Sequence, residues 1–64
     1  MTATIFATFL ESRHAREAQH KLQFLRVEHV DEGHDGISIT AMVGEELMER
    51  AMHVIRQSGG TVEQ

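Results

Sequence analysis

The middle of the chain carries an uninterrupted run of turn-forming residues, Asp31 to Gly36, and this run limits the folds open to the sequence. The segment before it, Val27 to Val30, is short and has strand-forming side chains, and in Ile37 to Val43 apolar and polar residues alternate. Two such segments around a loop that ends in Asp-Gly predict a β-hairpin. The rest of the fold has to be arranged around this antiparallel pair.

An amphipathic helix is predicted on each side of the hairpin. In the first, apolar residues recur at helical spacing: Ala15, Ala18, Leu22 and Leu25. Ser12 lies just before this stripe, and serine is a favourable N-cap residue.

The second helix is predicted to follow Gly44. It opens with Glu45 and Glu46, where the helix dipole favours acids, and it ends at Gly59-Gly60. Its apolar stripe consists of Leu47, Ala51, Val54 and Ile55.

Each end of the chain contributes one more predicted strand. Thr2 to Leu10 is rich in β-branched and aromatic residues and is apolar on both faces, which is typical of a central strand. Thr61 to Gln64 is expected to form an edge strand. The order β-α-β-β-α-β predicts an α+β, ferredoxin-like fold, a four-stranded antiparallel sheet with two helices on one face, as a single domain over residues 1–64.

Two segments resemble known families. Phe6 to Ala18 runs from a strand through Ser12 into an alanine-spaced helix and resembles the opening of the bacterial general stress protein domain. Arg50 to Thr61, with His53, Arg56 and the Gly59-Gly60 pair, is similar to the close of small ferredoxin-like regulatory modules, including the ACT type. The resemblance implies a stress-linked binding or interaction module, and no catalytic residue carries over.

The composition narrows the functional classes. A chain of 64 residues has room for one small core, and domains of this size are usually stabilised further by a disulfide, a metal or a partner subunit. No cysteine is present, so disulfides and thiolate metal sites are excluded. The net charge of −4 gives no field that attracts nucleic acid. With no apolar stretch of membrane-spanning length and no signal-peptide pattern in Met1 to Leu10, we expect a cytoplasmic protein that binds neither membrane nor cofactor.

The first strand suggests an interface. Phe6 and Leu10 share one of its faces and Ile5 and Phe9 the other, so one aromatic set is exposed unless something covers it. Met42, on the third strand, is placed to join that patch. We therefore expect a homodimer with Phe6, Phe9, Leu10 and Met42 at the interface. The alternative is that isolated apolar side chains face water.

The start of the first helix suggests an anion site. Ser12, Arg13, His14 and Arg16 combine free backbone N–H groups with two guanidinium groups, a setting that suits a small anionic ligand such as phosphate or a carboxylate. The alternative is a solvated basic patch whose arginines pair with nearby glutamates.

The hairpin loop suggests a weaker metal site. His29, Asp31, His34 and Asp35 are the side-chain types that hold Zn²⁺ or Ni²⁺, although their spacing matches no strong metal motif. The alternative is an acidic, solvated turn.

The sequence offers no catalytic motif: it has no cysteine nucleophile, no glycine-rich phosphate loop and no H-E-x-x-H. We therefore expect a homo-oligomeric interaction or ligand-binding regulatory module. The alternative is a small enzyme, or an accessory subunit of one, whose histidine and carboxylate site lies at a subunit interface.

Overall fold

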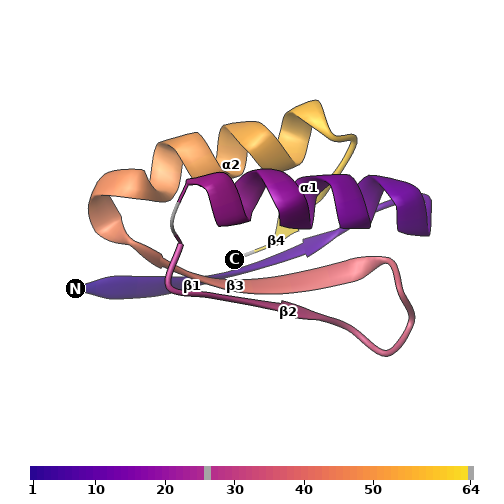
Figure 1. The fold of residues 1–64 in the computed structure, drawn as a ribbon, viewed down its shortest axis with the longest axis horizontal. Coiled ribbons are helices and arrows are strands. Elements are labelled where there is room, and N and C mark those ends of the chain that lie inside the picture. The colour runs from indigo at the N-terminus through magenta and orange to yellow at the C-terminus, as the bar shows by residue number, and fades with distance from the viewer. Residues whose placement is uncertain (26, 64) are drawn as a thin grey trace.

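The computed structural model describes residues 1–25 and 27–63 (Figure 1). Helices and strands follow one another in the predicted β-α-β-β-α-β order, with a short 3-10 helix before the second α-helix. The elements are β1 (Thr2–Thr8), α1 (Ser12–Phe24), β2 (His29–Glu32), β3 (Ser38–Gly44), η1 (Glu45–Leu47), α2 (Met48–Gln57) and β4 (Thr61–Glu63). Both α-helices lie on the same side of the sheet, and the described chain leaves the other side uncovered (Figure 1). The predicted α+β, ferredoxin-like fold is confirmed.

The sheet has four strands in the order β2-β3-β1-β4, and every neighbouring pair is antiparallel. β1 pairs with β3 along its whole length, from Thr2 opposite Gly44 to Thr8 opposite Ser38. The predicted central position of the first strand is therefore confirmed, although the strand ends at Thr8 and not at Leu10.

The core lies between the sheet and the helices. Side chains of β1 and β3 that point toward the helices are almost completely buried: Ile5, Ala7, Ile39, Ala41 and Val43. Of the predicted apolar stripes, the α-helices bury Ala15, Ala18 and Leu22 from α1 and Ala51 and Ile55 from α2. The other predicted members are only partly buried against the core: Leu25, which follows α1, Leu47, which lies in η1, and Val54 of α2. Alanines alternate with large aliphatic side chains in this layer, so the helices approach the sheet closely and the space between them is filled.

The start of α1 differs from the prediction. Glu11, and not Ser12, is the N-cap residue, and Ser12 is the first residue of the helix. The side chain of Glu11 makes no capping hydrogen bond. Its carbonyl oxygen accepts hydrogen bonds from the backbone N–H groups of His14 (3.1 Å) and Ala15 (3.3 Å). The predicted N-cap role of Ser12 is therefore wrong, because the extended residue that precedes the first helical turn lies one position earlier.

The hairpin is also tighter than predicted. β2 continues to Glu32, so Asp31 and Glu32 belong to the strand and only residues 33–37 make the loop. Gly33 closes this loop by donating its backbone N–H to the carbonyl of Ser38 at 2.9 Å. Gly36 adopts a φ of 75°, a left-handed conformation that glycine reaches without a steric penalty.

Asp35 holds the loop in shape. One of its carboxylate oxygens, Oδ1, accepts hydrogen bonds from the backbone N–H of Ile37 (3.0 Å), from the backbone N–H of Ser38 (3.1 Å) and from the Ser38 hydroxyl (2.9 Å). The bond from Ile37 comes first among the causes that lower the pKa of Asp35 below its ordinary value of 3.8. The charged form of Asp35 is therefore part of the hairpin.

The glycine pair after α2 brings the chain back onto the sheet. Gly59 has a φ of 86°, and Gly60 donates its backbone N–H to the carbonyl of Ile55 at 2.9 Å. A Cβ atom on Gly60 would lie 2.4 Å from the ring of Phe9, so this position has no room for a side chain. β4 then pairs with β1, which confirms the predicted edge strand for Thr61–Glu63; Gln64, the last residue of that prediction, lies outside the described residues.

Candidate interaction surface

The side of the sheet that faces away from the helices, here called the open face, is built from alternate residues of all four strands. Because successive side chains of a strand point to opposite faces, burial of Ile5 and Ala7 places Thr4, Phe6 and Thr8 on the open face. The register carries this assignment to the neighbouring strands, since directly paired residues lie on the same face. The open face comprises Thr2, Thr4, Phe6 and Thr8 of β1, Ser38, Thr40, Met42 and Gly44 of β3, His29 and Asp31 of β2, and Thr61 and Glu63 of β4.

The composition of the open face is unusual for a surface that meets only water. Every threonine of the chain lies on it, and none of its positions is a lysine or an arginine. Phe6 and Met42 stand at its centre on the two middle strands, and each is 40% exposed. The centre of the open face is therefore uncharged and partly apolar, in a chain whose net charge is −4.

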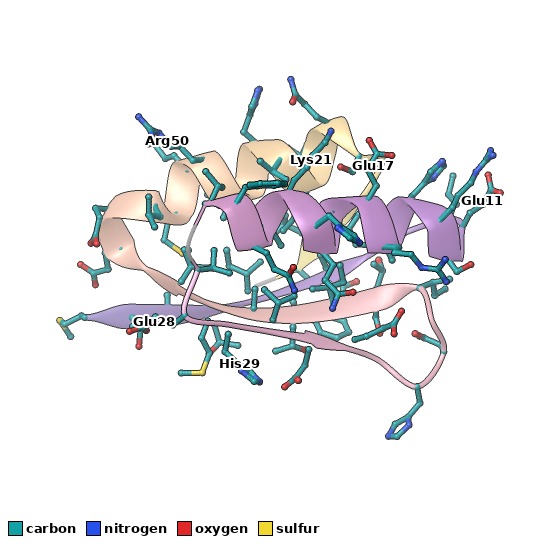
Figure 2. All side chains as sticks on the ribbon, in the orientation of Figure 1. Glu11, Glu17, Lys21, Glu28, His29 and Arg50 are labelled. Atoms are coloured by element: carbon teal, nitrogen blue, oxygen red, sulfur yellow. The ribbon has the colours of Figure 1, made fainter. Side chains whose placement is uncertain are left out.

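Charged side chains of the open face are confined to its two edges. On β2, His29 and Asp31 are neighbours on the same face, and Nε2 of His29 lies 2.8 Å from Oδ2 of Asp31. Figure 2 shows His29 pointing away from the helices. On the opposite edge, Glu63 of β4 lies beside Phe6. An uncharged centre with polar margins is the arrangement that protein interfaces usually have.

The predicted interface residues separate into two groups. Phe6 and Met42 lie together on the open face, as predicted. Phe9 is 4% exposed and belongs to the core, so its predicted place at an interface is wrong. It follows the end of β1 on the helix side, where its ring packs over Gly60. Leu10 is 88% exposed, but it lies in the loop beyond β1 and not on the open face.

The predicted metal site does not form. Within residues 1–25 and 27–63, no three histidine, aspartate or glutamate side chains lie together in a way that could hold a metal ion. His29 and Asp31 lie on the open face of β2, whereas His34 and Asp35 lie in the loop. The Asp35 carboxylate is engaged by the hairpin backbone, which is the physical reason that the four side chains do not converge.

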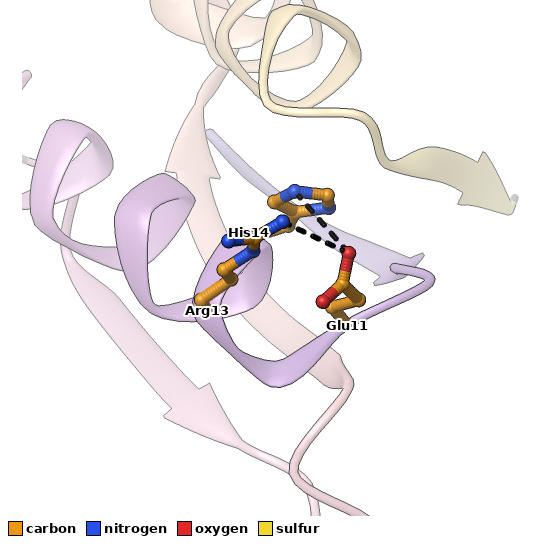
Figure 3. Close-up of polar contacts among 3 residues, drawn as sticks. All are labelled: Glu11, Arg13 and His14. Atoms are coloured by element: carbon orange, nitrogen blue, oxygen red, sulfur yellow. Dashed lines mark hydrogen bonds and ion pairs between the residues drawn. The ribbon is translucent and has the colours of Figure 1, made fainter.

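The predicted anion site at the start of α1 already contains a carboxylate of the chain. Figure 3 shows Glu11 facing Arg13 and His14: Oε2 of Glu11 lies 3.3 Å from Nη2 of Arg13 and 4.0 Å from Nε2 of His14. Ser12 and Arg16 are exposed in the same helical turns. The other ring nitrogen of His14, Nδ1, is buried near Gly59 and has no hydrogen-bond partner among the described residues. Glu11 therefore supplies the negative charge that this helix end favours.

A groove on the helix side of the molecule was not predicted from the sequence. It has a volume of about 470 Å³, and its walls are Leu25, Glu49, Arg50, His53 and Val54. Leu25 and Val54 belong to the two predicted apolar stripes, and their spacing was the signal in the sequence for this part of the surface. Glu49 and Arg50 carry opposite charges, and the groove favours neither an anion nor a cation.

Comparisons with known proteins add no relative. No protein family, no curated protein and no solved structure matches the chain. Within the described ranges, neither helix combines the length and the apolar composition that crossing a membrane requires. Any functional conclusion therefore depends on the geometry of this chain, and the two family resemblances remain hypotheses based on the segments that suggested them.

Proposed function

We propose that this chain is a small interaction module that self-associates through its open face. The observation that carries the proposal is the pair Phe6 and Met42, two large, partly exposed apolar side chains at the uncharged centre of a face that neither helix covers. Exposed apolar surface framed by polar residues is typical of protein contact sites. A core as small as this one also gains stability when a partner covers more apolar surface.

The edges of the sheet favour contact through the face over contact between edges. β2 is one edge and carries Asp31 and Glu32, and the other edge, β4, spans only Thr61–Glu63 and carries an acid. Charged and short edge strands are the usual means by which proteins prevent strands of different molecules from pairing. The open face has no charge at its centre to prevent contact.

A second copy of the chain is the partner that the composition and size of the open face favour. With no lysine or arginine on it, the face has no charge that would attract an acidic protein or nucleic acid. The two edge strands lie about 14 Å apart, three spacings of about 4.8 Å, and the longest strands, of seven residues, are about 23 Å long. Such a face is smaller than the roughly 800 Å² per partner of a standard interface. We therefore expect a dimer that depends on concentration and uses the whole face.

The test is the native mass of the purified protein, measured by light scattering during size exclusion from about 1 μM to 1 mM, the range expected for a small interface. The mass should rise from 7.2 kDa toward twice that value as the concentration increases. Replacing Phe6 with Glu should keep the protein monomeric at all concentrations while its circular dichroism stays unchanged, because a charge would be buried in the contact.

Leu10→Glu is the matched control, since it adds the same charge at an exposed apolar residue away from the face. This variant should associate like the original protein. A mass of 7.2 kDa at every concentration would refute the proposal, and so would equal effects of Phe6→Glu and Leu10→Glu.

A further inference from the structure

The register of the sheet arranges the centre of the open face in two rows that run across the strands. The first row, here called the Phe6 row, holds Glu63, Phe6, Thr40 and Asp31. The second row, here called the Thr4 row, holds Thr4, Met42 and His29. The large side chains therefore lie on a diagonal, since Phe6 is on β1 in one row and Met42 is on β3 in the other.

From this pattern we infer how two copies meet, on the premise that the proposed self-association occurs. The two sheets pack face to face around a twofold axis that crosses the strands midway between the Phe6 row and the Thr4 row. Such an axis places each strand over the same strand of the second copy, in the antiparallel direction, and exchanges the two rows. Every contact then occurs twice, as a twofold interface requires.

Exchange of the rows makes the centre of the face complementary in shape. Phe6 comes to lie over Thr4 of the second copy, and Met42 comes to lie over Thr40 of the second copy. A large side chain thus meets a small one at each of the four central positions. Alternation of large and small residues is what lets two packed sheets interdigitate without voids.

Charge selects this axis over the other twofold axis that the face permits. An axis parallel to the strands would also place large side chains over small ones, but it would lay β4 of one copy over β2 of the other. Glu63 would then face Asp31, two carboxylates in one contact. With the axis across the strands, His29 faces Asp31 of the second copy, so the pair that is already 2.8 Å apart within one chain becomes a group of four side chains.

The experiment mixes two variants that should prefer each other. In His29→Glu, the homodimer sets the introduced glutamate against Asp31 twice, and in Asp31→Lys it sets His29 against the introduced lysine twice. In the mixed dimer, one contact joins glutamate to lysine and the other joins the native histidine to the native aspartate. Both variants lose the native bond between the side chains of His29 and Asp31 within their own chain, so that loss cannot produce a preference for the mixed dimer.

Native mass spectrometry of an equimolar mixture should show the mixed dimer well above the one half expected for random pairing. A random mixture of dimers would overturn the axis across the strands while leaving self-association intact. Monomers in the unmodified protein at every concentration would instead refute the proposed function, and this arrangement with it.

Cysteine cross-linking gives an independent reading, because the chain has no cysteine of its own. Because facing sheets pack about 10 Å apart, farther than a disulfide spans, the probe is a short bifunctional thiol reagent. It should join a mixture of Met42→Cys and Thr40→Cys readily, and a mixture of Met42→Cys and Thr4→Cys much more slowly. The reverse result would identify the axis parallel to the strands and overturn this inference.

Discussion

The two faces of the sheet are made by the same strands, and they differ in what covers them. On the helix side, Ile5 and Ile39 are 1% exposed and face the apolar stripes of α1 and α2. One residue further along each strand, Phe6 and Thr40 face away from the helices, and Phe6 is 40% exposed. The first strand is therefore apolar on both sides, but the chain supplies a cover for only one.

This difference separates stability from association. Residues of the helix side contribute to the free energy of unfolding of a single chain, whereas residues at the centre of the open face are expected to act mainly on the contact between chains. Substitutions on the two faces should therefore respond differently to protein concentration.

The largest effect should come from the helix side. We expect Ile5→Ala to lower the free energy of unfolding by about 2–5 kcal/mol, because it leaves a cavity in a filled core. The whole free energy of unfolding of a domain of this size is only about 3–10 kcal/mol, so a large part of the Ile5→Ala variant should be unfolded. Thr2 is an exposed residue of the same strand, and Thr2→Ala should change the free energy of unfolding by less than about 0.5 kcal/mol. Urea unfolding followed by circular dichroism at low concentration measures both, and similar midpoints would contradict the division between the faces.

An intermediate loss of stability should result from placing a side chain at Gly60, where the chain passes close to the core after α2. The Cβ atom of Gly60→Ala would lie 2.4 Å from the ring of Phe9 and 2.8 Å from Cγ2 of Ile55. We expect a loss of about 1–3 kcal/mol from this overpacking. Introducing Phe9→Leu into the Gly60→Ala variant should recover part of that loss, because the smaller side chain makes room. A double-mutant cycle without coupling would show that Phe9 does not lie over Gly60.

The smallest of these effects concerns the hairpin and depends on pH. Since hydrogen bonds from Ile37 and Ser38 lower the pKa of Asp35 below 3.8, its ionised form stabilises the fold at neutral pH. That contribution is present above the pKa of the unfolded chain and is lost as the pH falls through the lower pKa of the folded state. Asp35→Asn should therefore melt below the unmodified protein at pH 7, and the difference in Tm should shrink as the pH falls below 3.8. A constant difference across this range would contradict the role of the charge.

Local sequence patterns predicted most of the helices and strands and their order. Helical spacing located the residues that α1 and α2 bury, and turn chemistry located the hairpin that separates β2 from β3. The errors occurred at the ends of elements. Serine is a favourable N-cap residue, but Ser12 is the first residue of α1 and the N-cap is Glu11. Asp31 and Glu32 have side chains common in turns but continue β2 because β3 offers them partners.

The candidate sites were harder to predict, because side chains of a suitable chemical type that are close in the sequence need not lie together in the folded chain. His29, Asp31, His34 and Asp35 look like metal ligands in the sequence, but the hairpin backbone engages Asp35 and the pairing with β3 turns His29 and Asp31 to the open face. The basic residues near Ser12 suggested an anion site, and the structure places the carboxylate of Glu11 beside Arg13.

The sequence by itself determined which residues share a face, because the periods of helices and strands are properties of the backbone. The first strand alone left open which of its faces the helices cover, since each face carries a phenylalanine, Phe9 on one side and Phe6 on the other. Only the tertiary structure decided this. The connections through α1 and α2 place both helices on the same side, so that Phe9 completes the core and Phe6 and Met42 are left at the surface.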